Sequence, residues 1–487
     1  MTPATATDSV NARDWPILVI ILTSYFMILL DNSVVFTGLP SIRADLNLSP
    51  TQLSWVQDAY TLVFGGLLLL GARAGDILGR RRLFVFGLVV FGVASALIGL
   101  APTGWWIIAS RALQGIGAAI VAPTSLALIT AYFDGEARAK AVAWYAATAG
   151  IGASLGLLVG GALTDLVSWR AAFLVNVPIA VAMVIGARAV LIETPRRPGQ
   201  LDVPGAVCAT LGVGALVFGT IESAQSGWGS PRVVAAFTVA AVLLVALVVN
   251  EGRVPQPILP LRLFASRQRS GAYAARMLYL GAMIGFFYFT TQLMQDGFGF
   301  TPLQAGLGFL PMTLVNFVVA LAIPRLSRVV PTPVLLAAGT ATTLVGMAWL
   351  SRAGAQGQYF ASVAAPMVLV GAGQGLAFAP LTSSGIAGVD GADAGAASGV
   401  VNTAHQLGMA LGLGVLVTVS AHAGSALSSP AAITEQVRVA LTGGSVLLAV
   451  ALVVSLAVIL PAHRRAGVRA LGGPPVAVAA RPLGSDG

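Results

Sequence analysis

The chain has 487 residues, of which 57% are hydrophobic and only 9% are charged. Soluble proteins average about 25% charged residues, so this chain has too little polar surface to cover a soluble fold. The composition therefore indicates a polytopic membrane protein, although the length alone would allow roughly three soluble domains.

Apolar runs long enough to cross a membrane, which takes about 20 residues, recur along the whole sequence. They lie near 16–39, 52–72, 83–101, 105–131, 141–163, 171–191, 203–222, 232–250, 271–294, 303–323, 333–350, 361–384, 397–420 and 438–461. The first run is too long for a cleaved signal peptide, and further spans follow it. We therefore predict an all-α polytopic membrane protein with about fourteen transmembrane helices.

The net charge of +9 is distributed unevenly between the two sides of these spans. If the N-terminus lies inside, 21 of the 27 basic residues fall on the inner side, Arg276 among them, and only 5 fall outside. Arg111 lies within a span. The positive-inside rule then predicts that both termini are cytoplasmic. The excess of basic residues therefore indicates orientation in a plasma membrane rather than binding to nucleic acid.

Cofactors and ATP are excluded by what the sequence lacks. The single cysteine, Cys208, can form no intrachain disulfide, and the three histidines are too scattered for a metal cluster. The only lysine, Lys140, is not part of a Gly-Lys-Ser/Thr triplet, so no phosphate-binding loop exists. A proton gradient is the natural alternative, because each charge that crosses yields about 2.3 kcal/mol per 100 mV.

Two segments of the first half reappear in the second half. The string GASLGL at 152–157 is similar to GMALGL at 408–413, and GIGAAIVAP at 115–123 is similar to GQGLAFAP at 373–380. These offsets predict two six-helix bundles separated by two inserted helices. The predicted parts are a cytoplasmic N-terminus (1–15), a first bundle (16–192), the inserted pair (203–251), a second bundle (271–461) and a disordered cytoplasmic tail (462–487).

The stretch GARAGDILGRRRLF (71–84) resembles the loop signature of the major facilitator superfamily. Four residues match that pattern: Asp76, Gly79, Arg80 and Arg81. Ala72 and Ile77 depart from it. Glycine permits a tight turn, and the aspartate can cap a helix or pair with an arginine. The alternative is a loop whose arginines set membrane orientation and do nothing more.

Two further stretches carry the same resemblance. RALQGIGAA (111–119) is similar to the fourth-span pattern, and it places Arg111 and Gln114 on one helix face. An arginine there must find a partner or a water-filled cavity, or extend its side chain to the outer surface. GIGASLGLLVGG (150–161) is similar to the antiporters' fifth-span signature, with Leu157 in place of its proline. Its glycines form a smooth face for close helix packing: Gly152, Gly156, Gly160 and Gly161.

LDNSVVFTGLPSI (30–42), WRAAFLVNVP (169–178) and LPLRLF (259–264) resemble signatures of the fourteen-span drug–proton antiporters. That resemblance implies bacterial multidrug or antibiotic efflux and an acidic residue at Asp31. An aspartate at the bilayer centre costs about 2.5–3.5 kcal/mol, so its presence favours a proton or substrate site. A bond to a neighbouring helix is the structural alternative. Asn32 and Asp58 are the other candidates for this site.

Weaker candidates are Glu222, which ends an inserted span, His405, which has a proton-transfer side chain inside a span, and Gln292. The leading hypothesis is a proton-driven exporter of small amphipathic or apolar drugs that works as a monomer in the lipid bilayer. The alternatives are a proton-coupled importer or facilitator of a metabolite and, third, a polytopic membrane enzyme, for which no convergent catalytic group is found.

Overall fold

The computed structural model describes residues 15–196, 199–354, 358–389, 393–423 and 429–463. These residues form helices and turns without any strand. Among them, thirteen helices are long and apolar enough to cross a membrane. The predicted span at 141–163 lies in α5, where residues 155–166 count as a shorter apolar segment. The all-α membrane fold is confirmed, and most of the two predicted tails, 1–15 and 462–487, lies outside the described residues.

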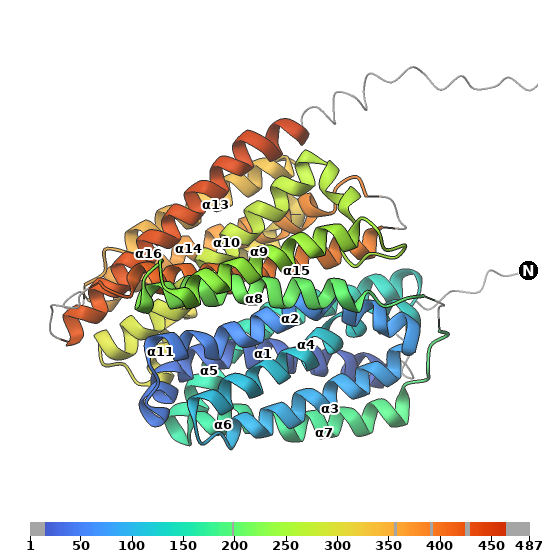
Figure 1. Cartoon of the computed structure of the whole chain (residues 1–487), viewed down its shortest axis with the longest axis horizontal. Helices are drawn as coiled ribbons and strands as arrows, with labels where there is room; N and C mark the ends of the chain where they lie inside the picture. Colours follow the sequence, from blue (N-terminus) through green and yellow to red (C-terminus); the bar gives the residue numbers. More distant parts are fainter. Residues whose placement is uncertain (1–14, 197–198, 355–357, 390–392, 424–428, 464–487) are drawn as a thin grey trace, which may run out of the picture.

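The first half of the chain folds into six consecutive spans, the last of them broken into two helices. These helices lie together in the lower part of the molecule in Figure 1. Its helices are α1 (Trp15–Leu46), α2 (Pro50–Leu78), α3 (Arg80–Gly99), α4 (Gly104–Tyr132), α5 (Gly135–Leu166), α6 (Trp169–Leu174) and α7 (Asn176–Val190). Local sequence explains their starts. At α2, Ser49 and Gln52 form a reciprocal capping box, and Pro50 occupies the first turn, where no backbone donor is needed.

The second half begins at a short 3₁₀ helix and again supplies six spans. Its elements are η1 (Leu261–Ala265), α10 (Arg267–Gln292), η2 (Leu293–Gly297), α11 (Pro302–Gly308), α12 (Leu310–Leu326), α13 (Thr332–Leu350), η3 (Phe360–Ala364), α14 (Ala365–Gly385), α15 (Ala394–Ser420), α16 (Ser429–Val454) and η4 (Ser455–Ile459). The turn into α11 repeats the capping box of α2, now with Thr301 and Gln304.

The two halves pack their helices in the same way at the repeated glycines. A Cβ atom on Gly156 of α5 would lie 2.8 Å from the Leu30 carbonyl oxygen of α1. A Cβ atom on Gly412 of α15 would lie 2.8 Å from the Gly281 carbonyl oxygen of α10. Only glycine permits backbones to approach this closely. The sequence repeat therefore corresponds to equivalent helix pairs, α1 with α5 and α10 with α15.

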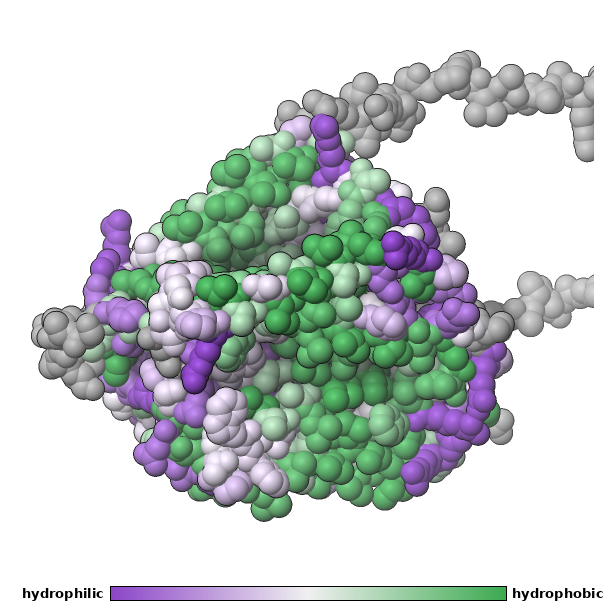
Figure 2. Space-filling model, in the orientation of Figure 1, coloured by the Kyte–Doolittle hydropathy of each residue, from purple (hydrophilic) through white to green (hydrophobic). Residues whose placement is uncertain are grey.

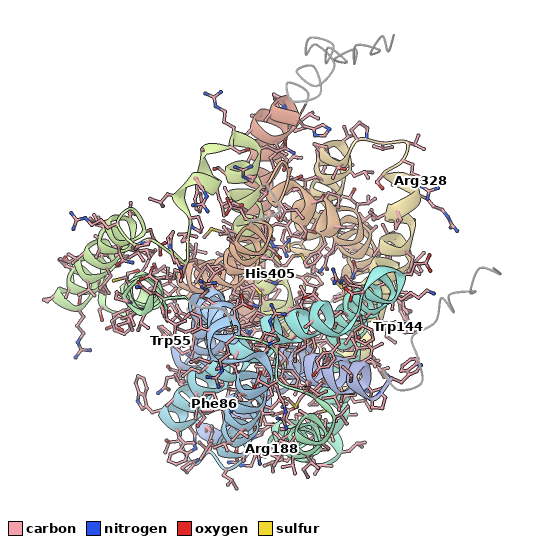
Figure 3. All side chains as sticks on the ribbon, turned by 90° about the vertical axis from the view of Figure 1, so that its right-hand side faces the viewer. Trp55, Phe86, Trp144, Arg188, Arg328 and His405 are labelled. Atoms are coloured by element: carbon pink, nitrogen blue, oxygen red, sulfur yellow. The ribbon has the colours of Figure 1, made fainter. Side chains whose placement is uncertain are left out.

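Helices α8 (Val203–Ser226) and α9 (Pro231–Glu251) form a hairpin between the two halves in the sequence. Helix α8 packs on α9 and also on α2 and α15, one helix from each half. Thr418 of α15 donates a hydrogen bond to the Thr220 carbonyl oxygen at 2.9 Å. Figure 3 shows the light-green hairpin at the edge of the molecule, beside both halves. It therefore covers the seam between α2 and α15 from outside.

The surface is apolar over the middle of the helices and hydrophilic mainly near their ends, as Figure 2 shows. Large apolar side chains such as Val181, Ile185 and Val318 are more than half exposed. Charged groups such as Asp31, Asp58 and Arg111 are instead fully buried. This inversion is expected for a protein whose outer surface contacts lipid. The interior is thus where its polar chemistry is concentrated.

The two halves are joined directly at the predicted outer ends of their helices. Arg43 of α1 forms an ion pair with Asp296 of η2 at 2.9 Å. Gln295 donates a hydrogen bond to the Thr37 carbonyl oxygen at 2.8 Å. Beside them, a Cβ atom on Gly161 of α5 would lie 2.6 Å from the Pro302 carbonyl oxygen of α11. In this conformation the bundles are therefore closed against each other on the outer side.

Candidate functional site

A buried ion pair joins α1 to α4 inside the first bundle. Arg111 Nη1 lies 2.7 Å from Asp31 Oδ2, and neither side chain is exposed. The other carboxylate oxygen accepts hydrogen bonds from Gln114 Nε2 at 2.8 Å and from Asn176 Nδ2 at 2.7 Å. Asp31 thus has three donors from α4 and α7. The structure brings the predicted Asp31, Arg111 and Gln114 together and adds Asn176.

Arg111 is held inside the bundle rather than extended toward the outer surface, although its Nη2 has no hydrogen-bond partner among the described residues. Its Nε donates to the Val56 carbonyl oxygen at 3.0 Å, and its guanidinium lies 4.1 Å from the centre of the Tyr60 ring. Gln114 links the cluster to Ser95 of α3 at 2.8 Å. The side chain therefore crosslinks α1, α2 and α4, and the surface-reaching alternative is wrong for this conformation.

Asp58 of α2 is also buried, but unlike Asp31 it has no donors around its carboxyl group in the described part of the chain. Its side chain is fully buried, yet neither carboxyl oxygen has a hydrogen-bond partner among the described residues. It lies close enough to Tyr288 of α10, in the second bundle, for an electrostatic interaction. An ionised carboxylate without donors in an apolar interior is very unfavourable. Asp58 therefore fits this site best when it carries a proton.

Asn32 forms no hydrogen bond with the Asp31 carboxylate in the described part of the chain. Its Oδ1 accepts a hydrogen bond from Gln57 Nε2 at 3.1 Å, one residue before Asp58. Asn32 is therefore placed to tie α1 to α2 next to Asp58. Asn32, a predicted candidate for the Asp31 site, therefore lies with Gln57 beside Asp58, whereas Asp31 is held by Arg111, Gln114 and Asn176.

The loop at 71–84 is a polar crosslink at the opposite, predicted inner end. Asp76 Oδ1 pairs with Arg80 Nη2 at 2.8 Å, and Arg80 Nη1 donates to the Ala127 carbonyl oxygen of α4 at 2.8 Å. Gly79 makes the turn with a φ of 106°, a conformation that favours glycine. Arg81 Nη2 donates to the Arg188 carbonyl oxygen of α7 at 2.7 Å.

Glu193, which follows α7, is a member of this crosslink that sequence reasoning missed. Its two carboxylate oxygens accept the backbone N–H groups of Arg81 and Arg82, each at 3.1 Å. A carboxylate at a helix N-terminus satisfies free donors and complements the helix dipole. The motif thus ties α2, α3, α4 and α7 into one unit, which exceeds what a topology signal alone requires.

The predicted glycines of α5 serve two different contacts. Gly152, Gly156 and Gly160 face α1, where an added Cβ would lie less than 3 Å from atoms of Leu29, Ser33 or Val34. Gly161 faces α11 of the other bundle instead. The stripe therefore joins the first bundle internally and, at its outer end, also forms part of the contact between bundles.

Glu222 and Gln292 lie outside the two buried clusters. Glu222 lies 3.8 Å from Arg232 Nη1 and accepts a hydrogen bond from Ser226, which stabilises the hairpin end. Gln292 donates to the Tyr288 carbonyl oxygen one turn earlier at 3.3 Å. His405 Nδ1 lies 3.1 Å from Arg276 Nη2 in the second bundle. Arg276 was counted among the inner-side loop residues, but its side chain is buried against α14 and α15 in the second bundle.

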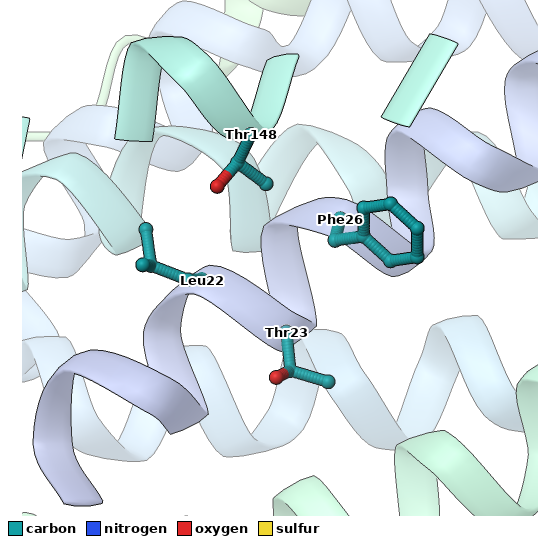
Figure 4. Close-up of a pocket in the computed structure, with 4 residues that line it drawn as sticks. All are labelled: Leu22, Thr23, Phe26 and Thr148. Carbon is teal, nitrogen blue, oxygen red and sulfur yellow. The ribbon is translucent and has the colours of Figure 1, made fainter. Parts of the chain in front are cut away.

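A small hollow of about 170 Å³ lies between α1 and α5, lined by Leu22, Thr23, Phe26 and Thr148 (Figure 4). None of these four residues is among the predicted site residues. Over the described ranges, no three His, Cys, Asp or Glu side chains lie close enough to hold a metal ion. The polar groups of the Asp31 and Asp58 clusters are carboxyl, guanidinium, amide and hydroxyl groups.

Comparison with known proteins gives a consistent result. A family model described as Major Facilitator Superfamily matches residues 21–413. The chain is 40% identical over 456 residues, covering 92% of it and 93% of the relative, to the cephamycin export protein CmcT of Amycolatopsis lactamdurans. It is also 40% identical over 443 residues, covering 87% and 86%, to the puromycin resistance protein pur8 of Streptomyces alboniger.

The fold also matches solved structures. A crystal structure of a bacterial homolog of the human lysosomal transporter Spinster, in an inward-facing and unoccupied conformation, superposes with a TM-score of 0.68. The match covers 93% of this chain and 98% of that one at 15% identity. At that identity the likeness concerns the fold alone.

Proposed function

Because this chain belongs to the major facilitator superfamily, we propose that it is a secondary active exporter that exchanges protons for small amphipathic or apolar drugs. The similarity to a cephamycin export protein and a puromycin resistance protein supports antibiotics as substrates. The observation that carries proton coupling is Asp58, a buried carboxyl group with no partner in the described part of the chain. The plasma membrane is the expected location, with both termini cytoplasmic.

The two buried aspartates have different roles in this proposal. Asp31 is held by Arg111, Gln114 and Asn176, so its charge is balanced and its geometry fixed. Asp58 has no such support and lies within electrostatic range of Tyr288 of the other bundle. When the bundles separate on the outer side, water can reach Asp58 and exchange its proton. Asp58 is then the proton carrier, and the Asp31–Arg111 pair is the scaffold beside it.

Alternating access follows from the contacts between bundles. The Arg43–Asp296 pair and the Gln295 hydrogen bond hold the outer ends together in this conformation. Breaking them and closing the inner ends would expose the same central site to the other side. A proton-coupled importer would use the same motion, but the named relatives act in export and resistance. Membership in a transporter family argues against a membrane enzyme.

The test is drug-dependent proton movement by purified protein. In proteoliposomes with an acidic lumen, puromycin or a cephamycin should drive proton release that a pH-sensitive dye reports. Asp58→Asn should remove that release while drug binding survives. Asp165→Asn, an exposed aspartate at the outer end of α5, is the matched control and should behave as wild type. Unchanged proton release in Asp58→Asn would refute Asp58 as the carrier, and wild type without any release would refute proton exchange.

A further inference from the structure

The second bundle contains a buried cation that no carboxylate balances. Arg276 of α10 is only 2% exposed. Its Nη1 donates to Thr382 Oγ1 of α14 at 2.9 Å, and its Nη2 lies 3.1 Å from His405 Nδ1 of α15. Its Nε has no hydrogen-bond partner in the described residues. No acidic side chain of the described chain forms an ion pair with it, unlike Arg111 in the first bundle.

The neighbours of Arg276 are all neutral acceptors or apolar groups. A guanidinium can only donate, so the Nδ1 atom that faces it is unprotonated and the imidazole is neutral. The Phe378 ring of α14 lies 4.8 Å from the guanidinium carbon, and it also packs edge-on against His405. A buried charge normally needs an opposite charge nearby. The cluster therefore lacks an anionic acceptor, and both Nε and the second N–H of an Nη atom remain to donate to one.

The cluster is close to a surface from which a ligand can reach it. Phe378 is 37% exposed, and the side chains of Thr382 and His405 are half-buried. Figure 3 shows His405 near the middle of the molecule, where the two halves meet. A displacement of the Phe378 ring would uncover the guanidinium and leave an aromatic face beside it. An anionic head on an apolar body has the complementary shape and charge.

We propose that Arg276, with Thr382 and His405, binds the carboxylate of an acidic amphipathic substrate while Phe378 contacts its apolar part. This inference rests on the proposed export function and names one of its substrate classes. Arginine pairs with a carboxylate through two parallel hydrogen bonds, and the free Nε with one Nη atom supplies that geometry. Uncharged and cationic drugs would not need this site.

The experiment compares one β-lactam as the free acid and as its methyl ester, with purified protein in phospholipid-free detergent at pH 7.5. Isothermal titration should show that wild type binds the acid at least tenfold more tightly than the ester. Arg276→Gln should lose this preference and keep its affinity for the ester. Arg328→Gln is the control, because Arg328 lies exposed at the edge of the molecule in Figure 3 and should keep the preference.

A second measurement needs no variant at Arg276 and covers the case in which Arg276→Gln does not fold. Phenylglyoxal labelling followed by peptide mass spectrometry should show Arg276 of the wild type protected by the acid and not by the ester. The proposal is overturned if wild type binds the acid no more tightly than the ester, or if Arg276→Gln keeps the preference for the acid. It is also overturned if the acid does not change the labelling of Arg276. Displacement of both compounds by short-chain phosphatidylglycerol would assign the site to lipid phosphate and also overturn it.

Failure of this inference and failure of the export function are distinguishable. Efflux of a cationic dye from cells that express wild type or the control Arg328→Gln tests export apart from the anion site, because that substrate carries no anion. Loss of the acid preference in Arg276→Gln, with dye efflux intact in wild type, supports the site. Absence of efflux of every drug by wild type, with the acid preference still measurable, would refute export and leave the anion site standing.

Discussion

The Asp31–Arg111 pair should show strong energetic coupling in a double-mutant cycle. At an effective dielectric constant of about 20, two unit charges 2.7 Å apart attract each other by roughly 6 kcal/mol, against which desolvation acts. Removing one partner leaves the other charge buried, which costs about 3–5 kcal/mol. Asp31→Asn and Arg111→Gln should therefore each destabilise the protein by that amount, whereas the double variant should lose far less than the sum.

The assay is the free energy of unfolding from SDS titration in mixed micelles, followed by tryptophan fluorescence. The control is the pair of Asp45 and Arg170, which are hydrogen-bonded at the outer surface and substantially exposed. The cycle for Asp45→Asn and Arg170→Gln should give a coupling of about 1 kcal/mol or less. If the Asp31–Arg111 cycle is additive within that same margin, the inference that this pair is the structural scaffold is wrong.

Three other substitutions test further contacts. Asp76→Asn should lower drug efflux several-fold without changing membrane insertion, because Arg80 loses its ion-pair partner. The control Asp134→Asn breaks a similar but exposed pair with Arg138 and should not lower efflux. Equal efflux by the two variants would show that the loop only sets membrane orientation. Gly156→Ala should destabilise the protein by about 1–3 kcal/mol in the same SDS titration, since its Cβ would lie 2.6 Å from Ser33 Cβ. Gly395→Ala, where nothing lies within 4 Å, is its control, and equal stabilities would contradict the packing argument. Asp296→Asn should lengthen the distance between spin labels at 102 and 352, on the outer loops of the two bundles, because the ion pair of Arg43 with Asp296 is lost. An unchanged distance distribution would show that this ion pair does not hold the outer side closed.

The sequence predicted the fold because membrane constraints leave a strong record in composition. Apolar runs, arginine-rich inner loops and repeated glycines each follow from a physical requirement of the bilayer or of close helix packing. The sequence also singled out Asp31, Arg111 and Gln114, because charges inside apolar spans are costly enough to be conspicuous. Arg111 and Gln114 are three residues apart, so helical spacing alone placed them together.

Partners that depend on long-range folding were less accessible. Asn176, the third donor to Asp31, lies 145 residues away in sequence, and Glu193 lies 112 residues from Arg81. Helical periodicity carries no information about such pairs. Arg276 was misplaced for a related reason: it follows an arginine-rich segment, so it looked like part of the inner loop. The signal that could have found it is its position inside the apolar run 271–294, in which no other charged residue occurs.

The hairpin of α8 and α9 has a consequence for where lipid-dissolved molecules can enter. Helix α8 contacts both α2 and α15, so one of the two seams between the bundles is covered along its length. A molecule that diffuses laterally in the bilayer meets helix α8 at this seam rather than the boundary between the two bundles. The opposite seam, between α5 and the pair α11 and α12, carries no such cover from the inserted helices. The hairpin therefore makes the two seams unequal, because one is covered by α8 and the other is sealed only by the direct contact between α5 and α11.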